Sequence, residues 1–232
     1  MQNRYAIIVA GGSGSRMKSN LPKQFLLLDG KPVAMHTLER FANAEHKLQL
    51  ILVLHPDMFA FWEELCEKHD FQTPHIVISG GETRFQSVRN GVRYIAEQQH
   101  QFLDNTLIAI HDAARPIITS ETIDACFEQT VLYAATVLAV PSTNSIRLGN
   151  EVENKAVERE KVWIIQTPQT FQGHILYQAF QQEEIPSFTD DASVVEKLGY
   201  SIHLIPGDHR NIKITFPEDI SIAQFYLKTL TN

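Results

Sequence analysis

Apolar runs and stretches with helix-spaced apolar side chains alternate along most of this chain. Residues 6–10 form a short apolar run rich in β-branched side chains, which is typical of a buried strand. Residues 33–44 then carry apolar side chains at helical spacing, and residues 48–54 form a second buried run. Strands that alternate with helices predict right-handed crossovers and a mostly parallel sheet.

The same alternation predicts the remaining elements. Helices are expected over residues 58–68, 83–99, 120–132, 174–181, 190–198 and from 218 onward, and strands over residues 75–78, 106–110, 134–140, 201–205 and 211–215. Ser120 is the expected cap of its helix. The pattern therefore predicts one α/β domain over residues 1–232, with a Rossmann-like, mostly parallel twisted sheet that helices cover on both faces.

The alternation breaks over about residues 141–166, where helical periodicity is absent. Two extended stretches, residues 145–148 and 162–165, flank a turn at Gly149 and Asn150, which together predict a β-ribbon. An extended hairpin cannot bury both of its faces by itself. We therefore expect an arm here that packs against another subunit or folds over the site.

Composition excludes several classes of partner. The chain has 232 residues, 44% of them hydrophobic, which is enough for one sizeable core. Its net charge of −7 argues against a nucleic-acid partner, since such proteins normally carry a basic excess. No apolar run approaches the length of a membrane span. The polar start before the first strand leaves no room for a cleavable signal peptide, so a cytoplasmic location is expected.

A glycine-rich loop with two nearby cations follows the first strand. It reads Gly-Gly-Ser-Gly-Ser-Arg-Met over residues 11–17. A Walker loop needs a glycine where Met17 stands, and the same methionine occupies the third glycine position of a dinucleotide fingerprint. Arg16 and Lys23 supply about the positive charge that a triphosphate uses. The loop thus predicts a phosphate site of a different kind.

A second motif, His-Asp-Ala-Ala-Arg-Pro, begins at His111 and follows the strand expected over residues 106–110. It lies at the same sheet edge as the glycine loop. Asp112 could hold Mg²⁺ against phosphate oxygens, or it could merely cap or pair with Arg115. His111 is expected to pack or hydrogen-bond rather than to act as a base, because its strand is apolar.

Two further stretches have both a structural and a functional interpretation. Residues 80–87 contain Gly-Gly and could read a nucleotide base through exposed backbone groups. Alternatively, Gly80 and Gly81 form only a tight turn and Thr83 is the N-cap of the helix that follows. Lys213 alternates with apolar neighbours, so it should point to the opposite face, where we expect the cleft. Thr189 or Asp190 is an expected helix cap.

Taken together, these motifs resemble the 2-C-methyl-D-erythritol 4-phosphate cytidylyltransferases of the non-mevalonate isoprenoid pathway. The resemblance spans nearly the whole chain in order: residues 10–17, 22–24, 80–88, 111–116, 157–159, 167–169, 189–190, 211–215 and 217–219. It implies a nucleotide-diphospho-sugar transferase-like fold. It also implies transfer of CMP from CTP to 2-C-methyl-D-erythritol 4-phosphate, with release of pyrophosphate.

The resemblance also assigns roles to particular residues. CTP would contact Ala10, Gly11, Gly12, Ser13, Gly14, Arg16, Lys23, Gly81, Glu82, Ser87, Asp112 and Ala113. The acceptor would contact Asp112, Arg115, Ser145, Arg159, Thr167, Thr189 and Lys213. The catalytic cations would be Arg16, Lys23, Arg159 and Lys213, with Mg²⁺ or another divalent cation on Asp112.

The same resemblance implies a homodimer formed through the arm, with Arg159 reaching in from the neighbouring subunit. One departure concerns this arm, because Asn144 and Ser145 stand where the family usually has an Asp-Thr pair. Serine keeps a hydroxyl, whereas Asn144 removes a charge from the acceptor side.

The implied chemistry needs no catalytic base, and three alternatives share parts of the pattern. An acceptor phosphate with a second pKa of about 6 is largely dianionic near neutral pH, so its oxygen can attack the α-phosphorus directly. The alternatives are a ribitol 5-phosphate cytidylyltransferase, a hexose 1-phosphate nucleotidyltransferase and a catalytically inactive nucleotide-binding regulator. The last predicts damage at Arg16, Lys23, Asp112 or Lys213, and all four are intact.

Overall fold

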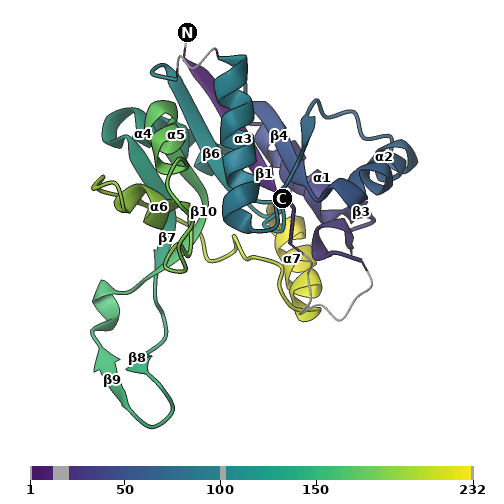
Figure 1. Cartoon of the computed structure of the whole chain (residues 1–232). Coiled ribbons are helices and arrows are strands. Elements are labelled where there is room, and N and C mark those ends of the chain that lie inside the picture. The colour runs from purple at the N-terminus through teal and green to yellow at the C-terminus, as the bar shows by residue number, and fades with distance from the viewer. Residues whose placement is uncertain (1, 13–20, 100–102, 231–232) are drawn as a thin grey trace.

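A seven-stranded sheet forms the centre of the computed structural model, which describes residues 2–12, 21–99 and 103–230 (Figure 1). In spatial order its strands are β11 (His203–Pro206), β7 (Ala135–Pro141), β10 (Trp163–Gln172), β6 (Thr106–Asp112), β1 (Asn3–Val9), β4 (Gln49–Leu54) and β5 (Ile76–Ser79). All neighbours pair in parallel except β10, which is antiparallel to both β6 and β7. The predicted mostly parallel sheet is confirmed.

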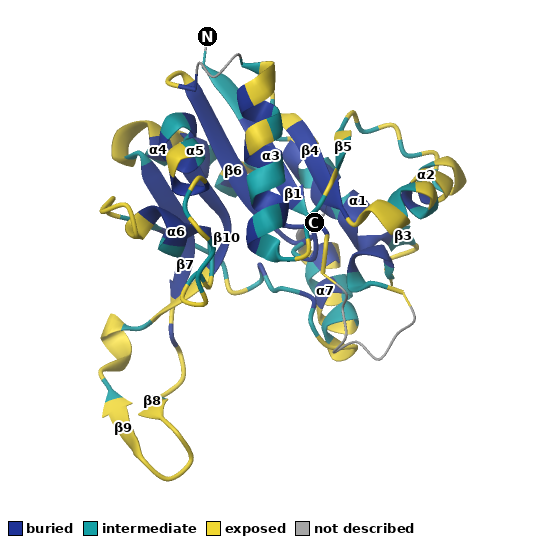
Figure 2. Cartoon of the chain, viewed as in Figure 1, coloured by how far each residue is buried: buried dark blue, intermediate teal, exposed yellow. Residues whose placement is uncertain are grey.

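Helices cover both faces of this sheet, as expected. Their bounds are α1 (Val33–Ala42), α2 (Phe59–Lys68), α3 (Arg84–Gln98), α4 (Ser120–Tyr133), α5 (Gly173–Ala179), α6 (Asp191–Glu196) and α7 (Glu218–Leu230). One core lies between the sheet and α3, α5 and α6, and a second lies between the sheet and α1, α2 and α4. Figure 2 shows the central strands β1, β4, β6 and β7 as mostly buried.

Alternation along β1 explains the two cores. Ile7 faces the α3 side and Ile8 faces the α1 side, and both are fully buried. Burying an isoleucine side chain contributes roughly 1.5–3 kcal/mol. At Gly91 of α3, an added Cβ would lie 2.9 Å from Ile7, so glycine lets the helix approach the strand closely. This packing sets the N-terminal end of α3 beside the carboxyl end of β1.

The arm differs from the prediction. Strand β8 (Ile146–Gly149) pairs with β9 (Asn154–Val157), whereas Trp163 begins β10 and pairs with Pro141 of β7. The expected ribbon partner over residues 162–165 therefore belongs largely to the main sheet, and the arm spans residues 142–162. Apolar alternation identified a strand there, but it could not show which neighbour the strand pairs with. The arm projects from the body and is mostly exposed (Figures 1 and 2).

Two other local predictions are wrong. Residues 211–215 form an extended segment outside any sheet, tied to the body where the Ile214 N–H donates to the Ala114 carbonyl oxygen at 2.8 Å. Helix α4 is capped by Thr119, whose hydroxyl accepts from the Thr122 N–H, and Ser120 is its first helical residue. A short hairpin of β2 (Leu27–Leu28) and β3 (Lys31–Pro32) precedes α1.

The sheet order places a crevice at the carboxyl end of β1. The chain leaves β1 toward β4 on one side, and β6 lies on the other side. In parallel α/β sheets, ligands bind where successive crossovers diverge in this way. The glycine loop after β1 and the motif that begins at His111 therefore meet at one edge, as the sequence predicted.

Candidate active site

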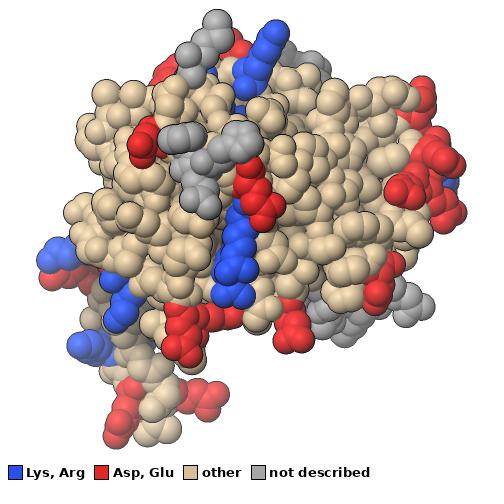
Figure 3. Space-filling view, turned by 45° about the horizontal axis from the view of Figure 1, so that its top comes forward, with Lys and Arg blue, Asp and Glu red and all other residues tan. Residues whose placement is uncertain are grey.

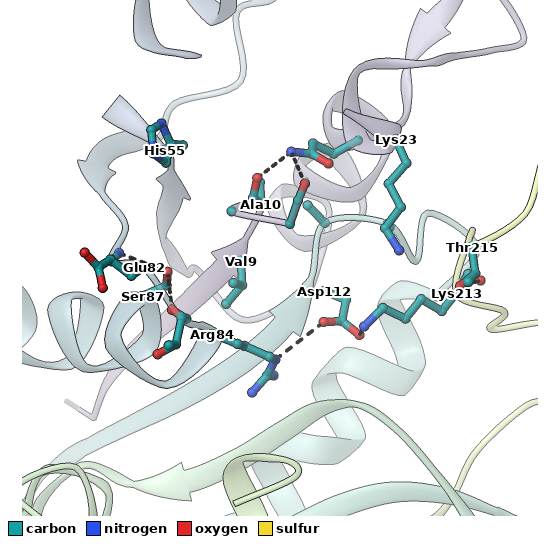
Figure 4. Close-up of a pocket in the computed structure, with 17 residues that line it drawn as sticks. Val9, Ala10, Lys23, His55, Glu82, Arg84, Ser87, Asp112, Lys213 and Thr215 are labelled. Carbon is teal, nitrogen blue, oxygen red and sulfur yellow. Dashed lines mark hydrogen bonds and ion pairs between the residues drawn. The ribbon is translucent and has the colours of Figure 1, made fainter. Parts of the chain in front are cut away.

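A cavity of about 530 Å³ opens at this edge of the sheet (Figure 4). Every predicted nucleotide-binding residue that the structure describes lines it: Ala10, Gly11, Gly12, Lys23, Gly81, Glu82, Ser87, Asp112 and Ala113. The other three, Ser13, Gly14 and Arg16, lie outside the described residues. Three segments far apart in the sequence thus converge on one space.

The glycine loop is held at its base by Gln24. The Gln24 side-chain amide donates to the carbonyl oxygens of Ala10 and Gly12, and its side chain is buried. The preceding residue, Lys23, begins a short 3-10 helix, Lys23–Phe25, and reaches into the cavity (Figure 4). Phe25 anchors this helix with its ring centroid 5.4 Å from that of Phe61. Residues 10–12, the described start of the loop, and Lys23 are therefore held by separate contacts.

The segment before α3 forms a preorganised backbone turn. The Gly81 N–H donates to the Ser87 hydroxyl at 3.1 Å, and that hydroxyl donates to the Thr83 carbonyl oxygen at 2.9 Å. Thr83 caps α3 by accepting from the Gln86 N–H, as the structural interpretation predicted. An added Cβ on Gly81 would lie 2.3 Å from Cβ of Gln86, so this position needs glycine.

Asp112 is the electrostatic centre of the cavity. Its Oδ2 atom lies 3.0 Å from Nζ of Lys213 and 3.3 Å from Nε of Arg115, and Nε of Arg84 lies 3.8 Å from Oδ1. Burial by itself raises the pKa of Asp112, but the charges of Lys213, Arg84 and Arg115 hold that pKa well below its usual range. The carboxylate stays ionised, and the pairing with Arg115 that the sequence left open is present.

Lys213 faces the cavity as predicted, although its segment is not a strand. Ile214 beside it is fully buried against residues of α7 and β2, including Ala223 and Leu28. The Lys213 side chain points the other way, toward Asp112 (Figure 4). Alternation in an extended chain therefore predicted the direction of the lysine without a sheet.

His111 is a buried hydrogen-bonding residue, as expected. The Thr167 hydroxyl accepts from the Asp112 N–H and donates to Nδ1 of His111, both at 3.1 Å, and Nε2 of His111 lies 3.1 Å from the Arg115 carbonyl oxygen. Burial lowers the pKa of His111 to about 4, so the ring is neutral near pH 7. The neutral ring donates through Nε2 and locks the turn that carries Asp112.

The predicted acceptor residues divide into two groups. Arg115, Lys213 and the buried Thr167 lie in or directly behind the cavity. Ser145 and Arg159 are exposed on the arm, and Thr189 is exposed beside a separate cavity of about 230 Å³. A single chain therefore does not bring all of them together.

Sequence reasoning missed Arg84 at the cavity wall and Asp191, the buried partner behind it. Arg84 lines the cavity and makes a double hydrogen bond to Asp191, whose side chain is buried. Burial disfavours the charge on Arg84, yet the Asp191 carboxylate raises the pKa of Arg84 above its usual value. Arg84 lies inside the Gly-Gly segment, which could have drawn attention to it. Its partner Asp191 is 107 positions away in the sequence, so no local pattern connects the two residues.

Positive charge is concentrated at the site, although the whole chain is acidic. Lys23, Arg84, Arg115 and Lys213 lie at or beside the cavity wall, against the carboxylate of Asp112. Elsewhere, charged side chains form small separate groups on the face seen in Figure 3. A cluster of cations in a cleft of low dielectric attracts a polyanion despite a net negative chain.

Fold and site together define an α/β protein of the nucleotidyltransferase type. The family model for 2-C-methyl-D-erythritol 4-phosphate cytidylyltransferase matches residues 5–229, and the chain belongs to this family. A relative of that name from Porphyromonas gingivalis is 47% identical over 227 residues, which cover 97% of this chain and 98% of the relative. Another from Bacteroides fragilis is 43% identical over 224 residues, covering 97% and 99%.

Solved structures agree with this assignment. The crystal structure of 2-C-methyl-D-erythritol 4-phosphate cytidylyltransferase from Francisella tularensis matches with a TM-score of 0.79 and 30% identity, covering 97% of this chain and 99% of that one. A crystal structure of a 4-diphosphocytidyl-2C-methyl-D-erythritol synthase matches with a TM-score of 0.81 and 31% identity, covering 98% of this chain and 100% of that one.

Within the described ranges, no helix is long and apolar enough to span a membrane.

Proposed function

We propose that this chain transfers CMP from CTP to 2-C-methyl-D-erythritol 4-phosphate, a step of isoprenoid precursor synthesis. The products are 4-diphosphocytidyl-2-C-methyl-D-erythritol and pyrophosphate. Membership of the family supports the reaction. One structural observation carries it furthest: the ionised Asp112, contacted by Lys213 and Arg115, lies beside a glycine loop at the same sheet edge.

Bringing two anions together is the main barrier to this reaction. The bond that forms joins an acceptor phosphate oxygen to the α-phosphorus of CTP, and the bond that breaks releases pyrophosphate. Lys23 and Lys213 line the cavity and would hold the developing charge, with Arg16 as a third cation on the glycine loop. The neutral, buried His111 takes no proton in this scheme, because the dianionic acceptor needs no base.

Asp112 is suited to a divalent cation that arrives with the nucleotide. Mg²⁺ commonly takes one or two protein carboxylates and completes its shell with substrate phosphates and water. Within the described part of the chain, no cluster of three acidic, histidine or cysteine side chains could hold a metal alone. One ionised carboxylate beside a phosphate loop fits the shared mode of binding. The bound cation would neutralise part of the phosphate charge.

The arm supports a homodimer in which the acceptor site is shared. It projects from the body, and Arg159 on it is exposed, with a guanidinium nitrogen 3.5 Å from the Thr143 carbonyl oxygen. In a dimer, Arg159 and Ser145 of one subunit would complete the acceptor site formed by Lys213 and Arg115 of the other. The whole chain would form a single cytidylyltransferase domain that carries this arm. We also propose that the enzyme works in the cytoplasm.

Release of pyrophosphate from CTP with a panel of acceptors tests the proposal. We expect turnover with 2-C-methyl-D-erythritol 4-phosphate and little with ribitol 5-phosphate or glucose 1-phosphate. Faster turnover with ribitol 5-phosphate would reassign the acceptor. CTP binding without turnover on any acceptor would instead identify a nucleotide-binding regulator.

A further inference from the structure

An ion pair at the cavity wall joins Arg84, the first residue of α3, to Asp191, the first residue of α6. The Nη1 and Nη2 atoms of Arg84 each donate to one oxygen of Asp191 at 2.6 Å. The Asp191 side chain is only 1% exposed. A bidentate pair of this kind fixes the plane of the guanidinium as well as its charge.

Arg84 also faces Asp112 (Figure 4). Its Nε atom stops 3.8 Å from Oδ1 of Asp112, which is beyond hydrogen-bond distance. Lys213 and Arg115 contact the other oxygen, Oδ2. The guanidinium thus lies between two buried carboxylates, and it is bonded to Asp191, which does not line the main cavity.

The position of Asp191 is itself fixed from two directions. Asp190 caps α6 by accepting from the Ser193 N–H at 2.9 Å. The Gln169 side chain of β10 donates to Asp190 at 2.9 Å and accepts from the Ala192 N–H at 2.8 Å. Asp191 therefore cannot follow Arg84 into the cavity, and the arginine is held toward α6.

We infer that Asp191 is a positioning residue that restrains Arg84 and keeps Oδ1 of Asp112 open to a cation carried in by the nucleotide. The inference rests on the proposed cytidylyl transfer. The Arg84 side chain is 33% exposed and is only partly desolvated, so on losing its partner it turns to another carboxylate within reach. Without Asp191, that carboxylate is Asp112, and Arg84 closes over Oδ1.

The substitution Asp191→Asn tests this restraint at nearly constant shape. We expect CTP to bind this variant roughly tenfold or more weakly than wild type in the presence of magnesium, but within about threefold in EDTA, by isothermal titration calorimetry. The matched control is Asp124→Asn. The Asp124 carboxylate accepts from the backbone amides of Glu45 and His46, outside the cavity lining, so this change should leave CTP binding unaltered.

A double variant separates positioning from a structural role. When Arg84→Gln is added to Asp191→Asn, nothing closes over Asp112. Arg84 is also one of the cavity cations, so its loss weakens CTP binding with and without magnesium alike. The factor by which magnesium strengthens CTP binding should nevertheless recover to within about threefold of wild type. Recovery supports the inference. A magnesium enhancement no greater than in Asp191→Asn, or an Asp191→Asn variant that binds magnesium and CTP like wild type, overturns it.

An Asp191→Asn variant that does not fold and a wild-type protein that transfers nothing lead to different conclusions. If Asp191→Asn does not fold, the double variant decides alone, because it removes both charges of the pair. A magnesium enhancement of CTP binding that stays below about a third of the wild-type value in the double variant then overturns the inference. Wild-type protein that binds CTP with magnesium but transfers nothing to any acceptor overturns the proposed function instead, and leaves the restraint on Arg84 to be judged from binding.

Discussion

The Nζ atom of Lys213 lies 3.0 Å from Oδ2 of Asp112, so an extended segment after β11 is joined to the end of β6. The Lys213 side chain is 38% exposed, whereas that of Asp112 is 10% exposed. The lysine can therefore contact an incoming phosphate while the carboxylate stays in place. In the proposed reaction, the same charge would hold Asp112 in the ion pair and contact the phosphate.

Replacing this lysine should impair turnover more than folding. Because a fixed cation at a developing negative charge is lost, Lys213→Ala should lower kcat by roughly 10²-fold or more. Steady-state pyrophosphate release measures the loss, and circular dichroism checks the fold. The control is Lys68→Ala, which removes an exposed lysine at the end of α2. Equal kcat values in the two variants would show that Lys213 takes no part in the reaction.

His111 should leave a signature in the pH dependence of stability. Its pKa in the folded protein is about 4, below the unfolded value of about 6.5, so the unfolded state binds the proton first. The stabilisation is therefore complete above about pH 6.5 and is lost as the pH falls toward 4, by about 3 kcal/mol. Urea unfolding of wild type and His111→Asn from pH 4 to 7 should show the difference between them narrowing as pH falls. A constant difference would show that His111 is not buried neutral.

Gly81 should be required for nucleotide binding rather than for global stability. An added Cβ would lie 2.3 Å from Cβ of Gln86, so Gly81→Ala must displace the turn before α3. We expect the KM for CTP to rise roughly tenfold or more, because small displacements of positioning groups are costly. The thermal unfolding midpoint should change little, since this turn is not part of the hydrophobic core. A wild-type KM would exclude this turn from the nucleotide site.

Mixed dimers test whether Arg159 acts on the neighbouring subunit. Lys23→Ala and Arg159→Ala should each be nearly inactive as homodimers. In a mixed dimer, one site receives an intact Lys23 from one chain and an intact Arg159 from the other, so mixing the two variants should restore part of the activity. Activity of the mixture that does not exceed the summed activities of the two variants would mean that Arg159 acts in its own subunit or outside the site.

Deletion of residues 142–162, the whole arm, should give a monomer by size-exclusion chromatography, and this monomer should be inactive.

Local patterns predicted the parts of the molecule that depend on local physics. Strand and helix periodicity identified the parallel sheet and the edge at which the glycine loop meets Asp112. Burial of Ile214 beside Lys213 indicated which way the lysine points. Thr119 and Ser120 are both good caps, so the pattern misplaced that helix start by one residue.

Long-range pairing was beyond what the pattern could determine. Strand β10 looks like one half of a ribbon, because apolar alternation does not specify a partner, yet it inserts antiparallel between β6 and β7. The pair of Arg84 and Asp191 depends on α3 and α6 packing against the same face of the sheet. Neither residue has a local feature that reveals the other.

The most direct test of the proposed reaction follows oxygen in the acceptor phosphate. CTP is incubated with 2-C-methyl-D-erythritol 4-phosphate whose phosphate carries ¹⁸O, and the product is examined by ³¹P NMR. Direct attack on the α-phosphorus predicts an ¹⁸O isotope shift on both phosphorus atoms of the new diphosphate and unlabelled pyrophosphate. Label confined to the acceptor phosphorus, or no diphosphate product at all, would contradict the proposed transfer.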